Sequence, residues 1–430
     1  MVTLLHRSEQ AHDDSHVASR MLRRLLRGYP TALVVHLWDG RTLHIGEGSP
    51  AFTLSLQHPG VLRDLVLYRD PVRLAEAYCS GEVDVTGNFD AAVNLRYYLE
   101  RLQLTFRERL LLAWRAFGLG SAERQLVREA AAASHLRHNS SESIAFHYDL
   151  SNAFYRLWLD ERMVYSCAYF ETPEQRLELA QRTKRDHICR KLRLRPGESL
   201  LDVGCGWGAL VCWAARHYGV RAHGITLSRN QFEHAQEEVR RQGLEAQVTI
   251  ELRDYRHLPA EACYDKVVSV GMFEHVGLKN LPGYFATVRR ILKPDGLFLN
   301  HGITSDEPGW KRGVSSKFVN RHVFPDGELD TVSNIQGVME DSGFEIFDVE
   351  GLRPHYALTL RHWVDRLDAK REAAVRLVGE RNYRVWRLYM TASAQQFENG
   401  ATGIYQILAA RKESRPPPLP LTRRDLYPGN

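Results

Sequence analysis

Cysteine is scarce in this chain of 430 residues, and its six cysteines show no metal-binding or redox spacing. They are Cys79, Cys167, Cys189, Cys205, Cys212 and Cys263. No two of them form a C-x-x-C pair, and none lies at ligand spacing from a histidine cluster. The sequence therefore predicts neither a disulfide framework nor a metal site.

Long apolar stretches are missing as well. No uninterrupted apolar run reaches the ~18 residues that a membrane-spanning helix needs. The first residues, MVTLLHRSEQAHDDSHVASR, carry charges and histidines where a secretory signal has an apolar core. We therefore expect a cytoplasmic protein that does not span a membrane.

Neither sign of charge is in large excess. Lys and Arg number 57 and Asp and Glu 52, which leaves a net charge of +5 and no reason to expect a nucleic-acid partner. With 44% hydrophobic and 25% charged residues, the composition excludes long disorder and fibrous repeats. At roughly 150 residues per domain, the length predicts two or three globular domains.

Composition divides the sequence into four parts. The polar segment 1–18 and the proline-rich segment 412–430 predict mobile ends. Strand-like and helical pieces in residues 19–136 predict a small α+β domain. A stretch rich in alanine and serine, LVREAAAASHLRHNSSES, predicts a linker or exposed helix and a boundary near residue 140. Residues 140–411 are then expected to form the larger domain.

Strands alternate with helices from Ser199 onwards. The strand-like pieces are SLLDVG, RAHGITLS, QVTIELRD, DKVVSVG and GLFLNHG, with helical segments between them. This alternation is typical of a parallel sheet that is covered by helices on both faces. The sequence therefore predicts an α/β fold with a doubly wound, mostly parallel sheet and a smaller N-terminal α+β domain.

A glycine-rich turn follows the first of these strands. LDVGCGWGAL places Gly204, Gly206 and Gly208 after Asp202, where missing Cβ atoms let a ligand approach backbone amides at a helix N-terminus. The third glycine comes one residue too early for the dinucleotide fingerprint, and Trp207 stands before it, which disfavours a phosphate ligand. A tight turn with close helix packing is the structural alternative. The pattern resembles the first motif of class I S-adenosylmethionine-dependent methyltransferases, which have a Rossmann-like fold.

Further cofactor contacts are expected after the next two strands. The segment GITLSRNQ lacks the carboxylate that this fold usually offers to the ribose, and contains Thr226, Leu227 and Gln231 instead. Ser228 and Gln231 also fit an S-x-x-Q capping box, so a structural role remains an alternative. Tyr255 is placed either to border the adenine or to lie half-buried at a strand end.

Three further strings narrow the chemistry. They are HYDLSNAFYRLWLDERMVYSCAYF from His147, VGMFEHVG from Val270 and LNHGI from Leu299. Together with the glycine turn, they resemble the cyclopropane-fatty-acyl-phospholipid synthase and mycolic acid cyclopropane synthase family over residues 140–411. The resemblance implies an enzyme that adds a methylene carbon from S-adenosylmethionine across a cis double bond in the acyl chain of a phospholipid.

Such a reaction needs a base in a site without reactive water. An unactivated alkene that attacks the sulfonium methyl becomes a carbocation, which must lose a proton to close the ring. In the resembled family, bound bicarbonate takes this proton. Carried over residue by residue, its ligands are Cys167, Glu274, His301, Tyr389 and the backbone of Ile303. Tyr165 and Ser166, in the same string as the cysteine, are assigned to the cofactor.

Each assignment has a rival interpretation. Cys167 alone would be taken for a small buried hydrophobe. His275 stands beside Glu274 and competes for its role, and Tyr383 competes with Tyr389 in the same helical segment. These alternatives are open at the level of the sequence.

Two segments are candidates for an interaction face. In SRMLRRLLRGYP, three leucines share one helix face among arginines, which suits either an anionic membrane surface or an intramolecular docking face. They are Leu22, Leu25 and Leu26. LQLTFRERLLLAWRAFGLG has a longer apolar stripe, interpreted first as a docking face between domains and otherwise as a membrane-facing surface, formed by Phe106, Leu110, Trp114 and Phe117. The resemblance implies a bilayer with unsaturated acyl chains as partner, peripheral association with the inner membrane face, and a homodimer.

Cyclopropane-fatty-acyl-phospholipid synthesis is therefore the predicted function. A fatty-acyl methyltransferase that leaves a methyl or methylene branch on carbon is the alternative within the same chemistry. A methyltransferase for a small polar molecule would use the same cofactor fold. A non-enzymatic lipid-binding protein is the third class, and the intact glycine turn speaks against it.

Overall fold

The computed structural model describes residues 2–68, 70–119, 150–259, 261, 263–310, 313–324, 327–413 and 419–427. The protein forms two compact units. The first comprises residues 1–136, 312–322 and 378–392, and the second comprises residues 137–311, 323–377 and 393–430. The expected linker and the boundary near residue 140 lie outside the described residues.

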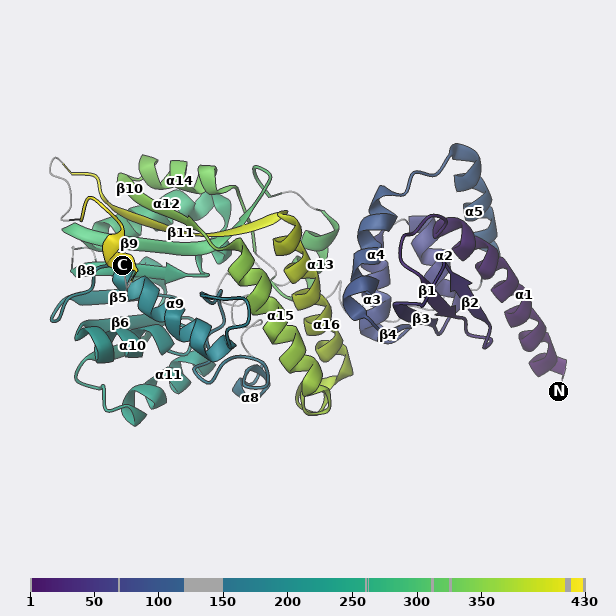
Figure 1. Cartoon of the computed structure of the whole chain (residues 1–430), viewed down its shortest axis with the longest axis horizontal. Helices are drawn as coiled ribbons and strands as arrows, with labels where there is room; N and C mark the ends of the chain where they lie inside the picture. Colours follow the sequence, from purple (N-terminus) through teal and green to yellow (C-terminus); the bar gives the residue numbers. More distant parts are fainter. Residues whose placement is uncertain are drawn as a thin grey trace. The chain divides into compact units, whose positions relative to one another are not determined.

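The first unit combines a four-stranded sheet with helices (Figure 1). Its strands, in the order β2-β1-β3-β4, are β1 (Leu33–His36), β2 (Thr42–Ile45), β3 (Phe52–Leu56) and β4 (Val83–Gly87). Its helices are α1 (Val2–Leu25), α2 (Pro59–Tyr68), α3 (Pro71–Ser80), α4 (Phe89–Arg101), α5 (Phe106–Gly118), α13 (Val314–His322) and the middle of α16 (Arg371–Asn399). The expected N-terminal α+β domain is confirmed.

Helix α1 begins at Val2, so residues 2–18 of the segment 1–18 that was expected to be mobile lie within a helix. Leu22, Leu25 and Leu26 are buried in the core of the first unit. The structural alternative therefore holds for these leucines, and a lipid-facing role for them is wrong. The physical reason is that a small unit has little apolar surface to spare, and α1 supplies part of its core.

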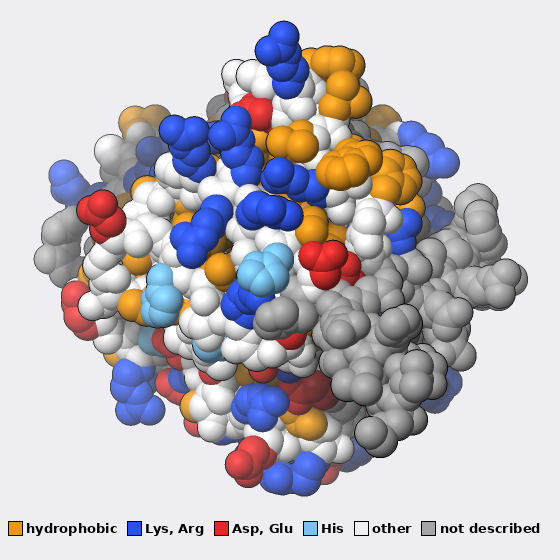
Figure 2. Space-filling model, turned by 90° about the vertical axis from the view of Figure 1, so that its right-hand side faces the viewer, with side chains coloured by type: hydrophobic (Ala, Val, Ile, Leu, Met, Phe, Trp, Pro, Cys, Tyr) orange, Lys and Arg blue, Asp and Glu red, His pale blue; other side chains and the backbone are white. Residues whose placement is uncertain are grey.

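The apolar stripe on α5 is exposed instead. Its four members, with exposed fractions between 56% and 75%, are Phe106, Leu110, Trp114 and Phe117, and the neighbouring Leu111 is exposed as well. The opposite face carries Leu112 and Ala116, which are buried. A capping box between Thr105 and Glu108 begins the helix, and Arg24 of α1 pairs with Glu108. Figure 2 shows hydrophobic side chains gathered beside lysine and arginine on one face of the molecule. None of the described residues of the first unit covers this stripe.

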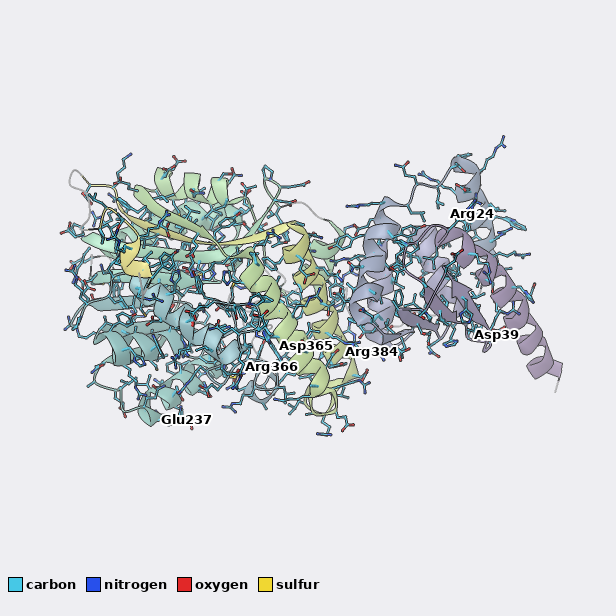
Figure 3. All side chains as sticks on the ribbon, viewed as in Figure 1. Arg24, Asp39, Glu237, Asp365, Arg366 and Arg384 are labelled. Carbon is cyan, nitrogen blue, oxygen red and sulfur yellow. The ribbon has the colours of Figure 1, made fainter. Side chains whose placement is uncertain are left out.

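Two segments from the C-terminal half complete the first unit. Helix α13 packs against α3. On α16, Arg384, labelled in Figure 3, donates to the carbonyl of Tyr78 at 3.1 Å. The guanidinium of Arg387 lies 3.8 Å from the ring centre of Phe89. The larger domain is therefore not the continuous stretch 140–411 that the sequence predicts. Amphipathic helices of both units look alike in sequence, so their partner cannot be read from periodicity.

The second unit is built on a seven-stranded sheet of order β10-β11-β9-β8-β5-β6-β7. Its strands are β5 (Ser199–Val203), β6 (Arg221–Thr226), β7 (Val248–Leu252), β8 (Tyr264–Val270), β9 (Leu292–Ser305), β10 (Phe344–Gly351) and β11 (Thr402–Arg411). Strand β11 is antiparallel to β9 and β10, whereas the pairs from β9 to β7 are parallel. The predicted doubly wound, mostly parallel sheet is confirmed, with β10 and β11 added at one edge.

Helices cover both faces of this sheet. They are α8 (Asn152–Tyr155), α9 (Leu177–Lys191), α10 (Ala209–Tyr218), α11 (Arg229–Arg241), α12 (Leu281–Ile291), α14 (Val332–Asp341), α15 (Arg353–Ala369) and the ends of α16. Figure 1 shows α9, α10 and α11 on one side and α12 and α14 on the other. Neighbouring strand residues point to opposite faces, so Leu200 packs with the first group and Leu201 with the second. None of the described helices is long and apolar enough to cross a bilayer.

The C-terminal segment is ordered where it is described. Within the expected mobile tail 412–430, the short 3-10 turn Arg424–Leu426 packs against α9, and Leu426 is buried. Asp425 pairs with Arg193 at 3.0 Å, and Arg190 donates to the carbonyl of Leu426. The prolines of this tail disfavour a long helix or a central strand but do not prevent packing, which corrects the prediction for residues 424–426.

Candidate active site

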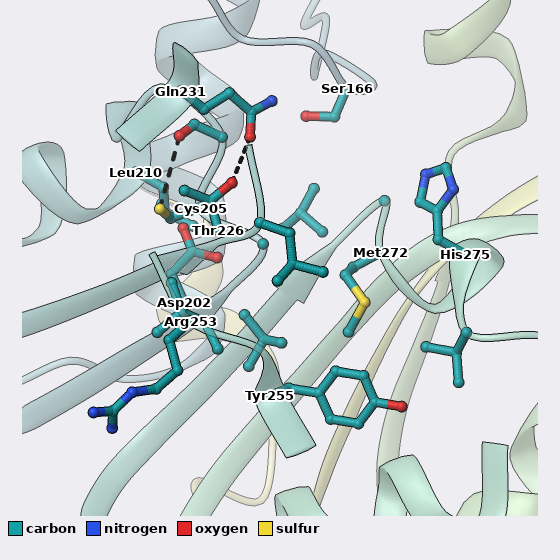
Figure 4. A pocket seen from close by; sticks show the side chains of 18 of the residues that line it. Ser166, Asp202, Cys205, Leu210, Thr226, Gln231, Arg253, Tyr255, Met272 and His275 are labelled. Carbon is teal, nitrogen blue, oxygen red and sulfur yellow. Dashed lines mark hydrogen bonds between the residues drawn. The ribbon is translucent and has the colours of Figure 1, made fainter. Parts of the chain in front are cut away.

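A cavity of about 530 Å³ lies at the carboxyl ends of β5, β6, β7 and β8 (Figure 4). Open parallel sheets bind ligands at this edge. The expected cofactor residues that line it are Tyr165, Ser166, Gly204, Gly206, Thr226, Leu227, Gln231 and Tyr255. Its dimensions are those of a site for a molecule of nucleoside size.

The glycine turn shapes the floor of this cavity. Gly204 and Gly206 have φ of 85° and 54°, a region that favours glycine. A Cβ on Gly204 would lie 3.1 Å from the side chain of Met272. The amides of Gly204 and Cys205 both donate to the carbonyl of Ile225, so they hold the turn against β6. The close approach of the backbone, rather than these two amides, is what the turn offers to a ligand.

Gly208 has a packing role. Gly208 is not one of the described residues that line the cavity. It is the residue at the start of α10, and its φ is 84°. A Cβ there would lie 3.1 Å from the Cβ of Ala235 on α11. The structural alternative, close packing of helices, therefore describes Gly208, while Gly204 and Gly206 face the cavity.

Thr226 and Gln231 combine the two roles that the sequence left open. Ser228 begins α11 and accepts a hydrogen bond from Gln231 N at 3.3 Å. The side chain of Gln231 does not close a full capping box, because its Oε1 accepts from Thr226 Oγ1 at 2.7 Å (Figure 4). Both side chains line the cavity. Their mutual hydrogen bond holds both side chains in the cavity wall.

Several charged residues of the cavity were not assigned to the site at the sequence level, among them Asp202 and Lys184. Asp202 and Lys184 are buried, and Lys184 Nζ donates to Ser166 Oγ at 2.8 Å. Burial raises the pKa of Asp202 to about 7, with the charge of Lys184 opposing, and burial lowers the pKa of Lys184 to about 8. Asp202 was noted only as the residue before the turn. Lys184 stands in a polar helix, QRTKRDHICRK, which carries no signal for a site.

Glu274 lies in the short 3-10 turn Phe273–His275 that follows β8. Its Oε1 accepts a hydrogen bond from the backbone N of Ile303 at 2.7 Å. Burial raises the pKa of Glu274 to about 7, against the effect of that hydrogen bond. Its Oε2 is buried and has no hydrogen-bond partner among the described residues. Glu274 is thus hydrogen-bonded to Ile303, the other residue expected beside the anion, whereas its rival His275 lines the cavity (Figure 4).

His301 lies on β9, two residues before Ile303. Burial, followed by the positive charges of Lys184 and Lys191, lowers the pKa of His301 well below its ordinary value. Its Nδ1 is 3.4 Å from Nε2 of Gln406, and its Nε2 is buried without a hydrogen-bond partner in the described parts of the protein. The imidazole is therefore neutral and presents one unpaired nitrogen.

Cys167 is fully buried in the loop after α8. Its Sγ lies 3.2 Å from the carbonyl of Ala168 and 3.9 Å from that of Leu352. Burial raises the pKa of the Cys167 thiol far above its ordinary value. A neutral thiol is a weak nucleophile, so Cys167 is suited to hold a polar group without attacking an electrophile.

Cys167, Glu274 and His301 do not themselves line the large cavity, but residues next to the first two in sequence do. Ser166 precedes Cys167 in its wall, and His275 follows Glu274. Cys167 and Glu274 thus lie in loops that border the cavity. Positive charge from Lys184 acts on both Cys167 and His301.

Aromatic rings surround the start of the cysteine loop. Tyr165 lies 5.8 Å from Tyr155, 5.4 Å from Trp158 and 5.3 Å from Trp363 between ring centres. Tyr155 and Trp158 are fully buried. Such a cluster keeps water away from the wall that Tyr165 contributes to the cavity.

Tyr389 is placed differently from the other expected catalytic residues. It lies in the part of α16 that belongs to the first unit, and its rival Tyr383 lies there too. Cys167, Glu274 and His301 belong to the second unit. The role of Tyr389 therefore stays a prediction.

Comparison with known proteins follows a similar division of the sequence. The family model described as mycolic acid cyclopropane synthetase matches residues 135–407. A model described as a domain of unknown function matches residues 21–105. The first match contains the glycine turn and all expected catalytic residues.

Similar proteins extend over most of the sequence. A probable fatty acid methyltransferase from Pseudomonas putida is 40% identical over 399 residues, which cover 92% of this protein and 96% of that one. The cyclopropane-fatty-acyl-phospholipid synthase of Escherichia coli K12 is 36% identical over 369 residues, covering 85% and 89%. The solved structure of mycolic acid cyclopropane synthase CmaA1 complexed with SAH and CTAB has a TM-score of 0.60 at 36% identity, and the match covers 64% of this protein and 99% of that structure.

Proposed function

The protein belongs to the mycolic acid cyclopropane synthetase family, and from this membership we propose that it converts unsaturated acyl chains of phospholipids to cyclopropanes. The observation that carries the proposal is a pair of buried polar atoms without hydrogen-bond partners among the described residues, Glu274 Oε2 and His301 Nε2. Unpaired buried polar atoms are unfavourable, so a bound species is expected beside them.

S-adenosylmethionine is the co-substrate, as for a methyltransferase of this family with a relative solved in complex with SAH. Gly204 and Gly206 let its methionine part approach the backbone, and Asp202 and Lys184 offer opposite charges to its ammonium and carboxylate groups. Tyr255 borders the same cavity. Bound in this cavity, the co-substrate would lie beside the loops that carry Cys167 and Glu274, since Ser166 and His275 line its wall.

The residues present fit a small anion such as bicarbonate. His301 Nε2 can donate to one oxygen, and Glu274 Oε2 can accept from a hydroxyl group. When bound there, bicarbonate supplies a weak base for the proton that the transferred carbon loses. Glu274 must then be ionised, which its raised pKa of about 7 makes sensitive to pH near neutrality. Cys167 stays a neutral thiol and does not trap the carbocation.

An enzyme that acts on the acyl chains of phospholipids must reach the surface of a bilayer, and α5 supplies a suitable face. Its exposed apolar stripe stands beside Arg107, which is also exposed. Apolar side chains enter the interface while arginines attract anionic headgroups, each worth about 1 kcal/mol near such a surface. We therefore assign membrane docking to α5 rather than to the leucines of α1. The inner-leaflet location and the homodimer stay predictions.

A fatty-acyl methyltransferase that leaves a branch on carbon is the second candidate. It is favoured by the relative from Pseudomonas putida, named a probable fatty acid methyltransferase, which matches 92% of this protein. That reaction begins with the same attack on the sulfonium methyl and differs in how the cation is quenched.

Mass analysis of the product separates the two candidates. Purified protein is incubated with unsaturated phospholipid vesicles, bicarbonate and S-adenosylmethionine that carries a CD3 group. Ring closure removes one deuterium and leaves a CD2 unit that resists hydrogenation. A methyl branch, formed when the cation loses a proton from the chain, retains the whole CD3 group and a double bond that hydrogenation reduces. A methylene branch keeps a CD2 unit but is also reduced by hydrogenation. Transfer to a soluble amine without vesicles, or no transfer at all, would contradict the proposal.

A further inference from the structure

We infer that Gln406 positions His301 by donating a hydrogen bond to its Nδ1, which leaves the imidazole proton on Nε2 as a donor to the bound anion. The inference rests on the proposed function, because it concerns the residue that faces the base. It names a positioning residue that touches neither the substrate nor the cofactor.

Strand register brings the two side chains together. Gln406 of β11 is directly opposite His301 of β9 in an antiparallel pair, and Glu350 of β10 is directly opposite Gln406. Directly opposite residues place their side chains on the same face of the sheet. The three side chains therefore form one row across three strands, with Gln406 in the centre.

The tautomer follows from the donor at Nδ1. Gln406 Nε2 lies 3.4 Å from His301 Nδ1, and an amide nitrogen can only donate, so Nδ1 must accept. A neutral imidazole with an accepting Nδ1 carries its proton on Nε2. His301 is neutral, because burial and two nearby lysines lower its pKa well below the ordinary value. Its unpaired Nε2 therefore carries a proton and can donate a hydrogen bond but cannot accept one.

Charges on the far side of Gln406 are compensated without His301. Glu350 pairs with Lys191 at 2.5 Å and with His187 at 2.8 Å. Burial works against its charge, yet the hydrogen bond from His187 and the charge of Lys191 hold the pKa of Glu350 at about 2. The uncharged amide of Gln406 stands between this ionised cluster and His301. A carboxylate at position 406 would instead draw a proton to Nδ1 and charge the imidazole.

The tautomer is measured directly by ¹⁵N NMR of histidine-labelled protein. Only 19 histidines are present, and the signals of His301 are identified by their loss in His301→Asn. We expect the full-length protein to show a protonated Nε2 and an unprotonated Nδ1 for His301. In Gln406→Met, which keeps the volume but loses the donor, the two tautomers should mix. In Gln406→Glu, proton density should move onto Nδ1.

Kinetics supply the second readout. Gln406→Met should raise the bicarbonate concentration for half-maximal turnover about tenfold, the effect of one misdirected hydrogen bond at a buried site, with the KM for S-adenosylmethionine unchanged. Gln336→Met is the matched control, because Gln336 donates to Val332 O within α14. It should change neither value.

The outcomes keep the inference separate from the proposed function. An unchanged ¹⁵N pattern of His301 in a folded Gln406→Met or Gln406→Glu variant overturns the inference, whatever the activity. If Gln406→Met does not fold, the Gln406→Glu spectrum decides alone. Absence of bicarbonate dependence in the unaltered enzyme contradicts the proposed function, while the NMR result still decides the tautomer.

Discussion

At the scale of single residues, the site combines ionisable groups whose charged forms are disfavoured by burial. Glu274 and Asp202 have raised pKa values, and Lys184 and His301 have lowered ones. Perturbed groups of this kind gather at functional sites because chemistry near neutral pH needs them. Among the expected catalytic residues, those that the family resemblance marks and those that the structure perturbs overlap at Cys167, Glu274 and His301. Lys184 and Asp202 emerge from the structure.

Glu274→Gln should make the free energy of unfolding less dependent on pH. The folded protein holds a proton on Glu274 up to about pH 7, whereas the unfolded protein releases it near 4.5, so its contribution to stability falls as pH rises through this window. The variant should therefore gain up to about 3 kcal/mol relative to the original protein between about pH 4 and pH 8. Urea unfolding at both values measures this. A difference that does not change with pH would contradict the burial of an ionisable Glu274.

The same Glu274→Gln variant should lose turnover while it still binds S-adenosylmethionine. The amide cannot replace the ionised carboxylate toward a bound hydroxyl group, but the glycine turn is untouched. Calorimetric titration with the cofactor and the vesicle assay test the two halves separately. Full turnover would show that the site assignment is wrong.

Lys184→Met should weaken S-adenosylmethionine binding by roughly 10- to 100-fold, because a charge-assisted hydrogen bond contributes about 1.5–3 kcal/mol. Lys266→Met is the control. Lys266 is also buried and pairs with Glu198 at 3.8 Å, but it is not in the cavity wall. Titration calorimetry should show that Lys266→Met binds S-adenosylmethionine with the affinity of the unaltered protein. Equal affinities for both variants would remove Lys184 from the cofactor site.

At the scale of elements, α1 and α5 show what helical periodicity can and cannot tell. Both carry apolar residues among arginines, and both fit a basic amphipathic helix. The leucines of α1 are buried, while Trp114 and its neighbours on α5 are exposed. Periodicity identifies an apolar face but not what covers it, because burial depends on elements distant in sequence.

Leu110→Ser and Trp114→Ser on α5 should each weaken binding to vesicles that contain anionic lipid, by about tenfold for a loss of ~1.4 kcal/mol of apolar transfer. Leu377→Ser is matched to the first variant, since Leu377 of α16 is exposed to a similar degree and lies in the second unit. Cosedimentation with vesicles measures all three. If Leu377→Ser weakens binding equally, α5 is not the docking face.

At the scale of the whole molecule, the two units are interleaved along the sequence. Residues 312–322 and 378–392 leave the second unit to complete the first. Arg384 and Arg387 of α16 contact α3, β4 and α4. The region that matches the family model, residues 135–407, therefore contains pieces that need the N-terminal domain as a packing partner.

A fragment of residues 150–430 should be less stable than the full-length protein. It retains α13 and α16 but lacks the helices and strands against which they pack in the first unit. We expect its melting temperature to fall by roughly 10 °C, the effect of losing about 3 kcal/mol in a domain of this size. Calorimetry measures the shift, and co-expression of residues 1–119 should restore part of it. Equal melting temperatures would show that the second unit is independent.

The sequence by itself determined the doubly wound sheet, the glycine turn and the family, because strand alternation, turn chemistry and short motifs are local patterns that neighbouring residues express together. It also identified the eight expected residues that line the cavity. Only the tertiary structure decided which apolar helix is covered, that Lys184 and Asp202 share the cavity, that Gln406 stands opposite His301, and that Tyr389 belongs to the first unit. These facts depend on strand register and on helix packing between residues far apart in sequence, and no local pattern encodes such pairings.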